Sequence, residues 1–185
     1  SPQWAAGLVQ QALFEPAYRD MAAQLIAREQ EGQLVVASAQ HTERWQPFQD
    51  CFASLFRLDG GDTSNARSAI RRLTEYAATR GNRIDPTGAH PIDLRVCPLT
   101  LAALLESRAA SGSARPALDR LDSLMQDGPQ WFSGGEDISP TAFANFVVAR
   151  LRAAQGDYRA ALAAIRRREV NYFPAFTWSL PAFLR

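Results

Sequence analysis

Apolar residues recur along most of the chain at the three- and four-residue intervals that are typical of amphipathic helices. Prolines stand near the start of several of these segments and glycines near the end, as helix boundaries require. The segment 34–39 holds a β-branched pair, but an isolated strand would lack a partner, so we favour a helix there. The pattern predicts an all-α domain spanning 1–185 with about eight or nine helices, including 2–13, 17–31, 48–58, 64–80, 98–110, 113–126, 140–155 and 158–169.

Two of these segments carry apolar faces that are clear enough to assign. The segment 17–31 places Tyr18, Met21 and Leu25 on one face, with Ala22 at its edge. The segment 64–80 is expected to turn five residues inward: Ala66, Ala69, Ile70, Leu73 and Tyr76. The run 81–91 is rich in Gly, Asn, Asp and Pro, and it is the strongest loop signal in the chain.

A short pattern recurs at the predicted helix junctions: a glycine, an alanine five positions later and an apolar residue four beyond that. A partial copy of the pattern, which lacks the apolar third residue, is formed by Gly32, Ala37 and His41. A glycine ends one helix with positive φ, and an alanine one turn into the next helix allows close backbone approach. The pattern therefore predicts antiparallel hairpins that stack on one another, with hinges at Gly61-Ala66-Ile70, Gly112-Ala117-Leu121 and Gly156-Ala161-Ile165.

These residues resemble the tetratricopeptide-repeat family. The best unit matches it at Gly156, Tyr158, Ala161, Leu162 and Ile165, with Pro174 where that family often closes its second helix. A second, approximate unit has Ala117, Leu118 and Leu121 after Leu101, Leu104 and Leu105. The chain departs from the family at Asn145, Val148, Ala149 and Arg152, and its spacing exceeds the usual period of about 34 residues. The alternative is an irregular helical bundle in which these glycines are ordinary helix stops.

The resemblance implies an α-solenoid-like hairpin array with units at 47–80, 98–127 and 139–169. It further implies a non-catalytic scaffold or sensor that binds a protein or peptide within a larger bacterial signalling or regulatory protein. The groove of such an array is lined by its first helices, so Arg108, Asn145 and Arg152 are the expected partner contacts. Trp178 belongs to the aromatic segment 172–183, which is expected either to join the core or to contact a partner or a second copy.

Composition narrows the function classes. The net charge is +1 and all twenty basic residues are arginine, so no global field attracts nucleic acid or anionic lipid. No apolar run approaches the roughly 18 residues of a membrane span. The chain begins without Met and ends inside an apolar run, so we expect a fragment of a longer protein.

Cys51 and Cys97 are the only cysteines. Cys51 lies among Phe48, Phe52 and Leu55 on an apolar helix face, which predicts a buried free thiol and favours the cytoplasm. The alternative is a Cys51–Cys97 disulfide, which would require an oxidising, extracytoplasmic compartment.

Motifs for chemistry are few. His90 lies near Cys97, so a cysteine hydrolase is a remote alternative. His41 has no second histidine at a metal-binding interval, and no cofactor or metal is expected. The run Arg166–Arg168 is interpreted as a solvated face or a clasp for an acidic partner. The remaining rival function is a regulatory domain that encloses a small-molecule effector between helices.

Overall fold

The computed structural model describes seven stretches of the chain: residues 16–30, 47, 50–51, 53–84, 92–108, 115–127 and 140–167. Residues 53–59 are helical. The other elements are η1 (Pro16–Tyr18), α2 (Arg19–Gln30), α4 (Thr63–Arg80), β1 (Arg83–Ile84), β2 (Ile92–Asp93), α5 (Val96–Ser107), α6 (Pro116–Asp127), α7 (Pro140–Ala154) and α8 (Tyr158–Ile165). Within these stretches, the prediction of an all-α fold is confirmed apart from the small strand pair. The predicted segments 2–13 and 34–39 lie outside the described residues.

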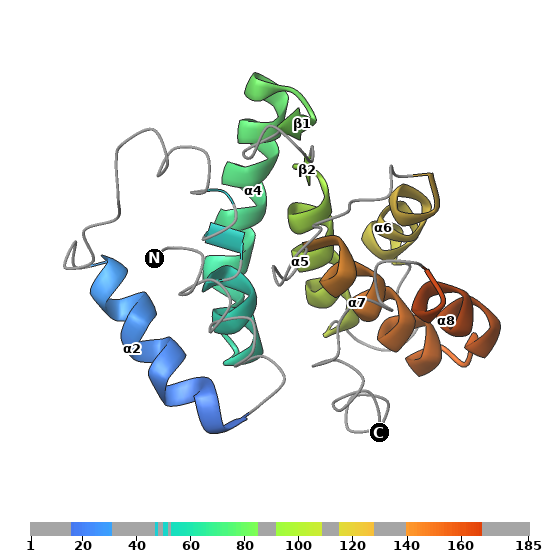
Figure 1. Cartoon of the computed structure of the whole chain (residues 1–185), viewed down its shortest axis with the longest axis horizontal. Coiled ribbons are helices and arrows are strands. Elements are labelled where there is room, and N and C mark those ends of the chain that lie inside the picture. Colours follow the sequence, from blue (N-terminus) through green and yellow to red (C-terminus); the bar gives the residue numbers. More distant parts are fainter. Residues whose placement is uncertain are drawn as a thin grey trace.

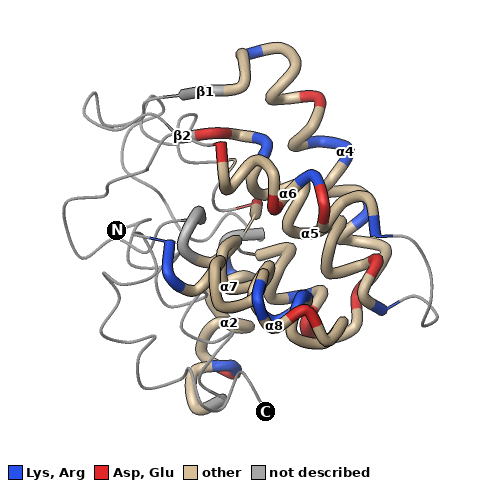
Figure 2. Tube along the Cα trace, turned by 90° about the vertical axis from the view of Figure 1, so that its right-hand side faces the viewer, with Lys and Arg blue, Asp and Glu red and all other residues tan. Residues whose placement is uncertain are grey.

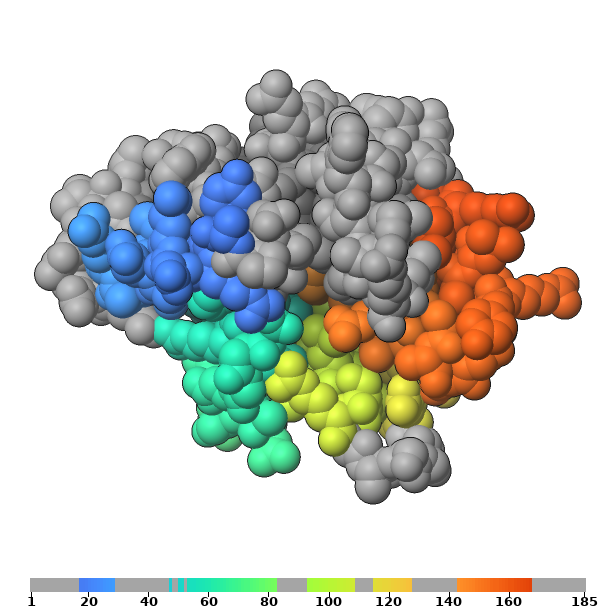
Figure 3. Space-filling view, turned by 90° about the horizontal axis from the view of Figure 1, so that it is seen from below, coloured from blue at the N-terminus to red at the C-terminus, as the bar shows by residue number. Residues whose placement is uncertain are grey.

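Helices that follow one another in the chain pack side by side (Figure 1). Helix α5 lies in the middle, in contact with α4, α6 and α7, and α7 packs in turn against α6 and α8. Helix α2 lies at one end of the molecule and α8 at the other, as a second view shows (Figure 3). An ion pair between Arg19 and Asp59 ties α2 to the helix of residues 53–59. The core runs through all of these helices and consists largely of leucine, alanine and valine.

Two of the three predicted glycine hinges lie in the described residues, and both are tight turns. Gly61 has φ +99° and Gly156 has φ +80°, and a Cβ at either position would meet nothing within 4 Å. Glycine is therefore favoured there by backbone conformation and not by crowding. The aspartate that follows each glycine caps the next helix: Asp62 accepts from the Asn65 amide and Asp157 from the Ala160 amide. Gly112 lies outside the described residues.

The alanines of the repeated pattern are buried where helices meet. Ala66, Ala117 and Ala161 are all buried, and Leu121 four residues after Ala117 is fully buried. Helix α8 packs along α7 through Ala161 and Ala164. The predicted burial of these alanines is thus confirmed in α4, α6 and α8.

The face predicted for the first described helix was right at Ala22 and wrong at Tyr18 and Met21. Ala22 and Ile26 are the buried residues of α2, whereas Tyr18 and Met21 are exposed. Tyr18 belongs to the 3-10 turn that precedes the α-helix, so it does not follow the helical register. Ala22 and Ile26 are one turn apart and therefore lie on the same face of α2.

The predicted loop 81–91 includes a strand that the sequence pattern did not reveal. Strands β1 and β2 pair antiparallel, with Arg83 opposite Asp93 and Ile84 opposite Ile92. The Leu94 amide extends the pairing by donating to the Asn82 carbonyl at 2.8 Å. The pair ends directly before α5, which begins at Val96, two residues earlier than predicted. Pro98 then falls in the first turn, where a missing N–H leaves no helical bond unmade.

A carboxylate at the end of α5 caps the start of α6. Glu106 accepts from the Ala117 amide through both carboxylate oxygens at 3.0 Å, and from the Leu118 amide at 3.4 Å. First-turn amides have no partner within their own helix, and the helix dipole favours a negative charge at that end. Glu106 therefore connects the end of α5 to the start of α6, although the two bonded residues are eleven positions apart in sequence.

Replacing Glu106 by alanine should lower the free energy of unfolding by about 1–2 kcal/mol, since it removes a helix cap. Urea denaturation followed by circular dichroism measures the change. Glu75→Ala, at an exposed position of α4, is the matched control and should change stability by less than about 0.5 kcal/mol. Equal effects of the two substitutions would show that the Glu106 cap contributes nothing.

Candidate functional site

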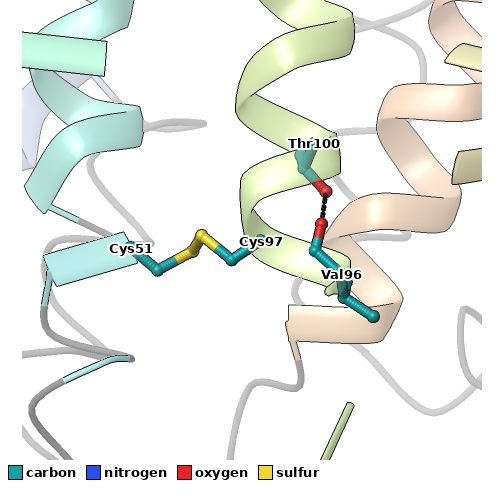
Figure 4. The surroundings of a disulfide bond; sticks show 4 residues. All are labelled: Cys51, Val96, Cys97 and Thr100. Carbon is teal, nitrogen blue, oxygen red and sulfur yellow. Dashed lines mark hydrogen bonds between the residues drawn. A yellow bond between two sulfur atoms is a disulfide. The ribbon is translucent and has the colours of Figure 1, made fainter. Parts of the chain in front are cut away.

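The two cysteines form a disulfide that joins the helix of residues 53–59 to α5 (Figure 4). Cys51 is itself helical and lies two residues before this stretch, and Cys97 lies in the first turn of α5, with their Cα atoms 6.0 Å apart. Both are buried. The predicted free thiol at Cys51 is therefore wrong, and the alternative disulfide is what the structure contains. The periodicity showed correctly that Cys51 is buried, but it could not show that the partner lies 46 residues away.

The disulfide also removes the nucleophile from the cysteine-hydrolase alternative. A cysteine attacks as a thiolate, and the Cys97 sulfur is bonded to Cys51 instead. His90, the proposed base, lies outside the described residues, as does His41. Among the described residues, no group of three or more His, Cys, Asp or Glu is arranged to hold a metal ion.

The four predicted partner contacts lie in different surroundings. Arg108 is exposed at the C-cap of α5. Asn145 is 0% exposed, in the middle of α7. Arg152, near the end of α7, has a side chain only 16% exposed. Trp178 lies outside the described residues. The structure thus brings Asn145 and Arg152 into the interior and leaves Arg108 on the surface.

Asp122 of α6 is the centre of a polar cluster that holds α6, α7 and the turn after α8 together. Its side chain is only 8% exposed. Arg152 donates to one carboxylate oxygen through Nε at 3.1 Å, and Arg167 donates to the other at 2.5 Å. Gln126 adds a bond to the same carboxylate at 3.2 Å. Arg167 also donates to the side-chain oxygen of Asn145 at 2.7 Å, which gives the buried amide an ionic partner.

The electrostatics of this cluster favour the charged forms. Burial raises the pKa of Asp122, but hydrogen bonds from Arg167, Gln126 and Arg152, together with the charge of Arg167, outweigh it and hold the pKa below its ordinary value. Burial lowers the pKa of Arg152, and its bonds to Asp119 and Asp122 more than reverse this. The cluster is a compensated ionic network, so its geometry suits a structural role.

Sequence reasoning missed Asp122 and Arg167, although the first of them carried a signal. Asp122 lies on the same helical face as Leu118, Leu121 and Met125, all of which are buried. A carboxylate on an apolar stripe indicates a buried charge that requires partners. Arg167 belongs to a run that was interpreted as solvated, and nothing local distinguishes its inward side chain from that of its neighbour Arg166.

A second candidate surface is the outer face of α8, at the end of the described chain (Figure 3). Tyr158 is 73% exposed and Leu162 is 46% exposed. They are four residues apart, so they lie next to each other on the helix. Ala161 and Ala164 lie on a different face of α8 and are buried, and α8 contacts α7. This surface therefore presents two adjacent large apolar side chains to solvent.

None of the helices within the described ranges combines the length and the apolar character that crossing a membrane demands. No protein-family model, no curated protein and no solved structure matches this chain.

Proposed function

We propose that this chain is a non-catalytic helical domain that binds a protein or a peptide, as part of a larger signalling or regulatory protein. The observation that carries the proposal is the exposed pair Tyr158 and Leu162 on the last described helix. Tyrosine is enriched among the residues that contribute most to protein interfaces, and adjacent exposed apolar side chains are typical of contact surfaces. In this proposal α8 contributes to the contact surface.

The arrangement of the helices supports the same proposal. From α4 onward, helices that follow one another in the chain are in contact, the junctions at Gly61 and Gly156 are short capped turns, and the ionic cluster and the disulfide link helices that are distant in sequence. Cross-links of this kind restrict rearrangement of the helices, and a preorganised surface has a lower entropic penalty of binding. We retain the tetratricopeptide-like array as the proposed architecture, with units 47–80, 98–127 and 139–169.

The disulfide changes the proposed compartment. Disulfides persist in oxidising environments and are rare in the cytosol. A buried bridge between two helices supports an extracytoplasmic location, in place of the cytoplasm that the free-thiol interpretation favoured. We therefore propose that the partner is met outside the cytoplasm.

Photo-crosslinking from α8 tests the proposal. A benzoylphenylalanine at position 158 should give a discrete cross-linked protein in the native extract, and excess unlabelled wild-type chain should compete it away. A competitor carrying Leu162→Glu should fail to do so, since a charge replaces the apolar contact. The matched control is the same photo-probe at Arg71, an exposed residue of α4.

Two outcomes would contradict the proposal. One is equal cross-linking from positions 158 and 71. The other is a reproducible rise in melting temperature with a metabolite, together with no cross-linked protein from position 158. That second result would favour the alternative of a domain that binds a small-molecule effector.

A further inference from the structure

The exposed face of α8 carries a row of arginines beside its apolar pair. Successive residues of a helix are about 100° apart, so Arg159 and Arg166, seven positions apart, project in nearly the same direction. That direction is next to the line of Tyr158 and Leu162. Arg166 is the C-cap of α8 and keeps helical dihedral angles, so it continues the row. All four side chains belong to exposed residues.

These two arginines have no acidic partner within the described chain. The described ion pairs involve other arginines, namely Arg19, Arg72, Arg95, Arg152 and Arg167. The contrast with Arg167 is informative, because that neighbour of Arg166 turns inward to Asp122 and Asn145. Residues 158–166 contain two arginines and no acidic residue. The adjacent Asp157 is engaged with the Ala160 amide as a helix cap.

The basic character of this surface is confined to one face of α8, because the described helices as a whole carry charges of both signs (Figure 2). The net charge of the whole chain is only +1. A membrane-binding helix needs a larger apolar face and a stronger basic field than α8, with eight residues, provides. Nucleic-acid binding also needs many phosphate contacts. Two guanidinium groups beside two apolar side chains fit a smaller ligand that combines carboxylates with apolar residues.

From this geometry we infer that the outer face of α8 binds an acidic amphipathic helix of a partner protein. The apolar residues of that helix contact Tyr158 and Leu162, and its Asp or Glu side chains pair with Arg159 and Arg166. The inference rests on the proposed function and specifies the chemistry of the partner. It also specifies the spacing: carboxylates about two turns apart on the partner helix match Arg159 and Arg166, which are two turns apart on α8.

Two synthetic helical peptides serve as probes. One carries leucines four residues apart flanked by glutamates, and its twin has lysine in place of every glutamate. Fluorescence anisotropy at low salt should show that the whole chain binds the glutamate peptide and not the lysine peptide. Added salt should weaken this binding because the pairs are exposed.

The variant Arg159→Glu/Arg166→Glu should bind the glutamate peptide at least about tenfold more weakly, since two attractive pairs become repulsive. Tyr158→Ala should also weaken binding severalfold, without affecting folding at so exposed a position. The matched control is Arg71→Glu/Arg120→Glu, which makes the same change in net charge at exposed positions of α4 and α6 and should leave binding unchanged.

The inference is overturned if both peptides bind alike or neither binds, or if the control weakens binding as much as the α8 variant. It is also overturned if phosphatidylserine vesicles, or a second copy of the chain in sedimentation, depend on Arg159 and Arg166 instead. A cross-linked protein at position 158 combined with any of these results would leave the proposed function standing and reject only the acidic partner. Absence of that cross-link would reject the proposed function itself.

Discussion

Replacing Asp122 by alanine is expected to lower the free energy of unfolding by about 3–5 kcal/mol, which is the usual effect of removing one partner from a buried ion pair. The substitution leaves Arg152 and Arg167 with side chains only 16% and 15% exposed and without their shared carboxylate. Arg167 would also lose the anchor that holds it against Asn145, so the end of α8 should detach from α6 and α7. Urea denaturation monitored by circular dichroism measures the change.

Asp119 provides the control for this prediction. It pairs with Arg152 at 2.9 Å, but its side chain is 66% exposed. Exposed pairs contribute about 0–1 kcal/mol, so Asp119→Ala should have a small effect. A triple variant, Asp122→Leu with Arg152→Met and Arg167→Met, should recover most of the stability because no charge is then left buried. Equal effects of Asp122→Ala and Asp119→Ala would contradict the prediction.

The same carboxylate gives the fold an acid sensitivity of definite sign. The pKa of Asp122 is lower in the folded chain than in the unfolded chain. Its contribution is therefore fully present above the unfolded value of about 4, and it is lost as the pH falls through the lower folded value. The difference in unfolding free energy between wild type and Asp122→Asn should shrink progressively as acid is added below about pH 4.

Helix boundaries were predictable wherever the boundary signals are local. Helix α7 was expected to begin at Pro140 and to end near Gln155, and it spans Pro140–Ala154. Helix α4 was expected over 64–80 and spans Thr63–Arg80, with Asp62 as its cap and Gly81 at its end. Asp62 caps α4 through an amide only three residues away, so the local sequence contains the whole interaction. The hinges at Gly61 and Gly156 were predictable for the same reason.

The polar cluster was not predictable, because its partners are distant in sequence. Arg167 and Asp122 are 45 residues apart. The inward direction of Arg167 depends on where α8 ends, and α8 ends at Ile165, four residues before the predicted end. Asn145 and Arg152 were expected on a binding groove because they lie on the first helix of a predicted hairpin. The periodicity that placed them there cannot distinguish a groove from an interface between helices.

The strands and the disulfide depend on non-local pairing as well. Strands β1 and β2 have two residues each, too few for an alternating pattern to appear. For the cysteines, the sequence offered only one intramolecular pairing. Whether the two thiols approach each other depends on how α5 packs beside the helix of residues 53–59, and that packing is a tertiary property.

Removing the disulfide is expected to destabilise the fold by up to about 4 kcal/mol, the estimate for a closed loop of this length. The two cysteines are 46 residues apart in sequence. The bridge therefore restricts the unfolded chain over a segment that contains all of α4 and both strands. It also holds α5 next to the helix of residues 53–59, so its loss should loosen the contact on that side of α5 first.

The measurement compares wild type with Cys51→Ala/Cys97→Ala, each with and without dithiothreitol. Wild type should lose stability in reductant, whereas the double variant should be less stable from the start and unaffected by it. Both sulfurs are buried in the folded chain, so reduction should require unfolding and should be slow without urea. Thiol titration in denaturant should find no free thiol in unreduced wild type. Two free thiols, or equal stability with and without reductant, would show that the disulfide does not form. The argument for an oxidising compartment would then be lost.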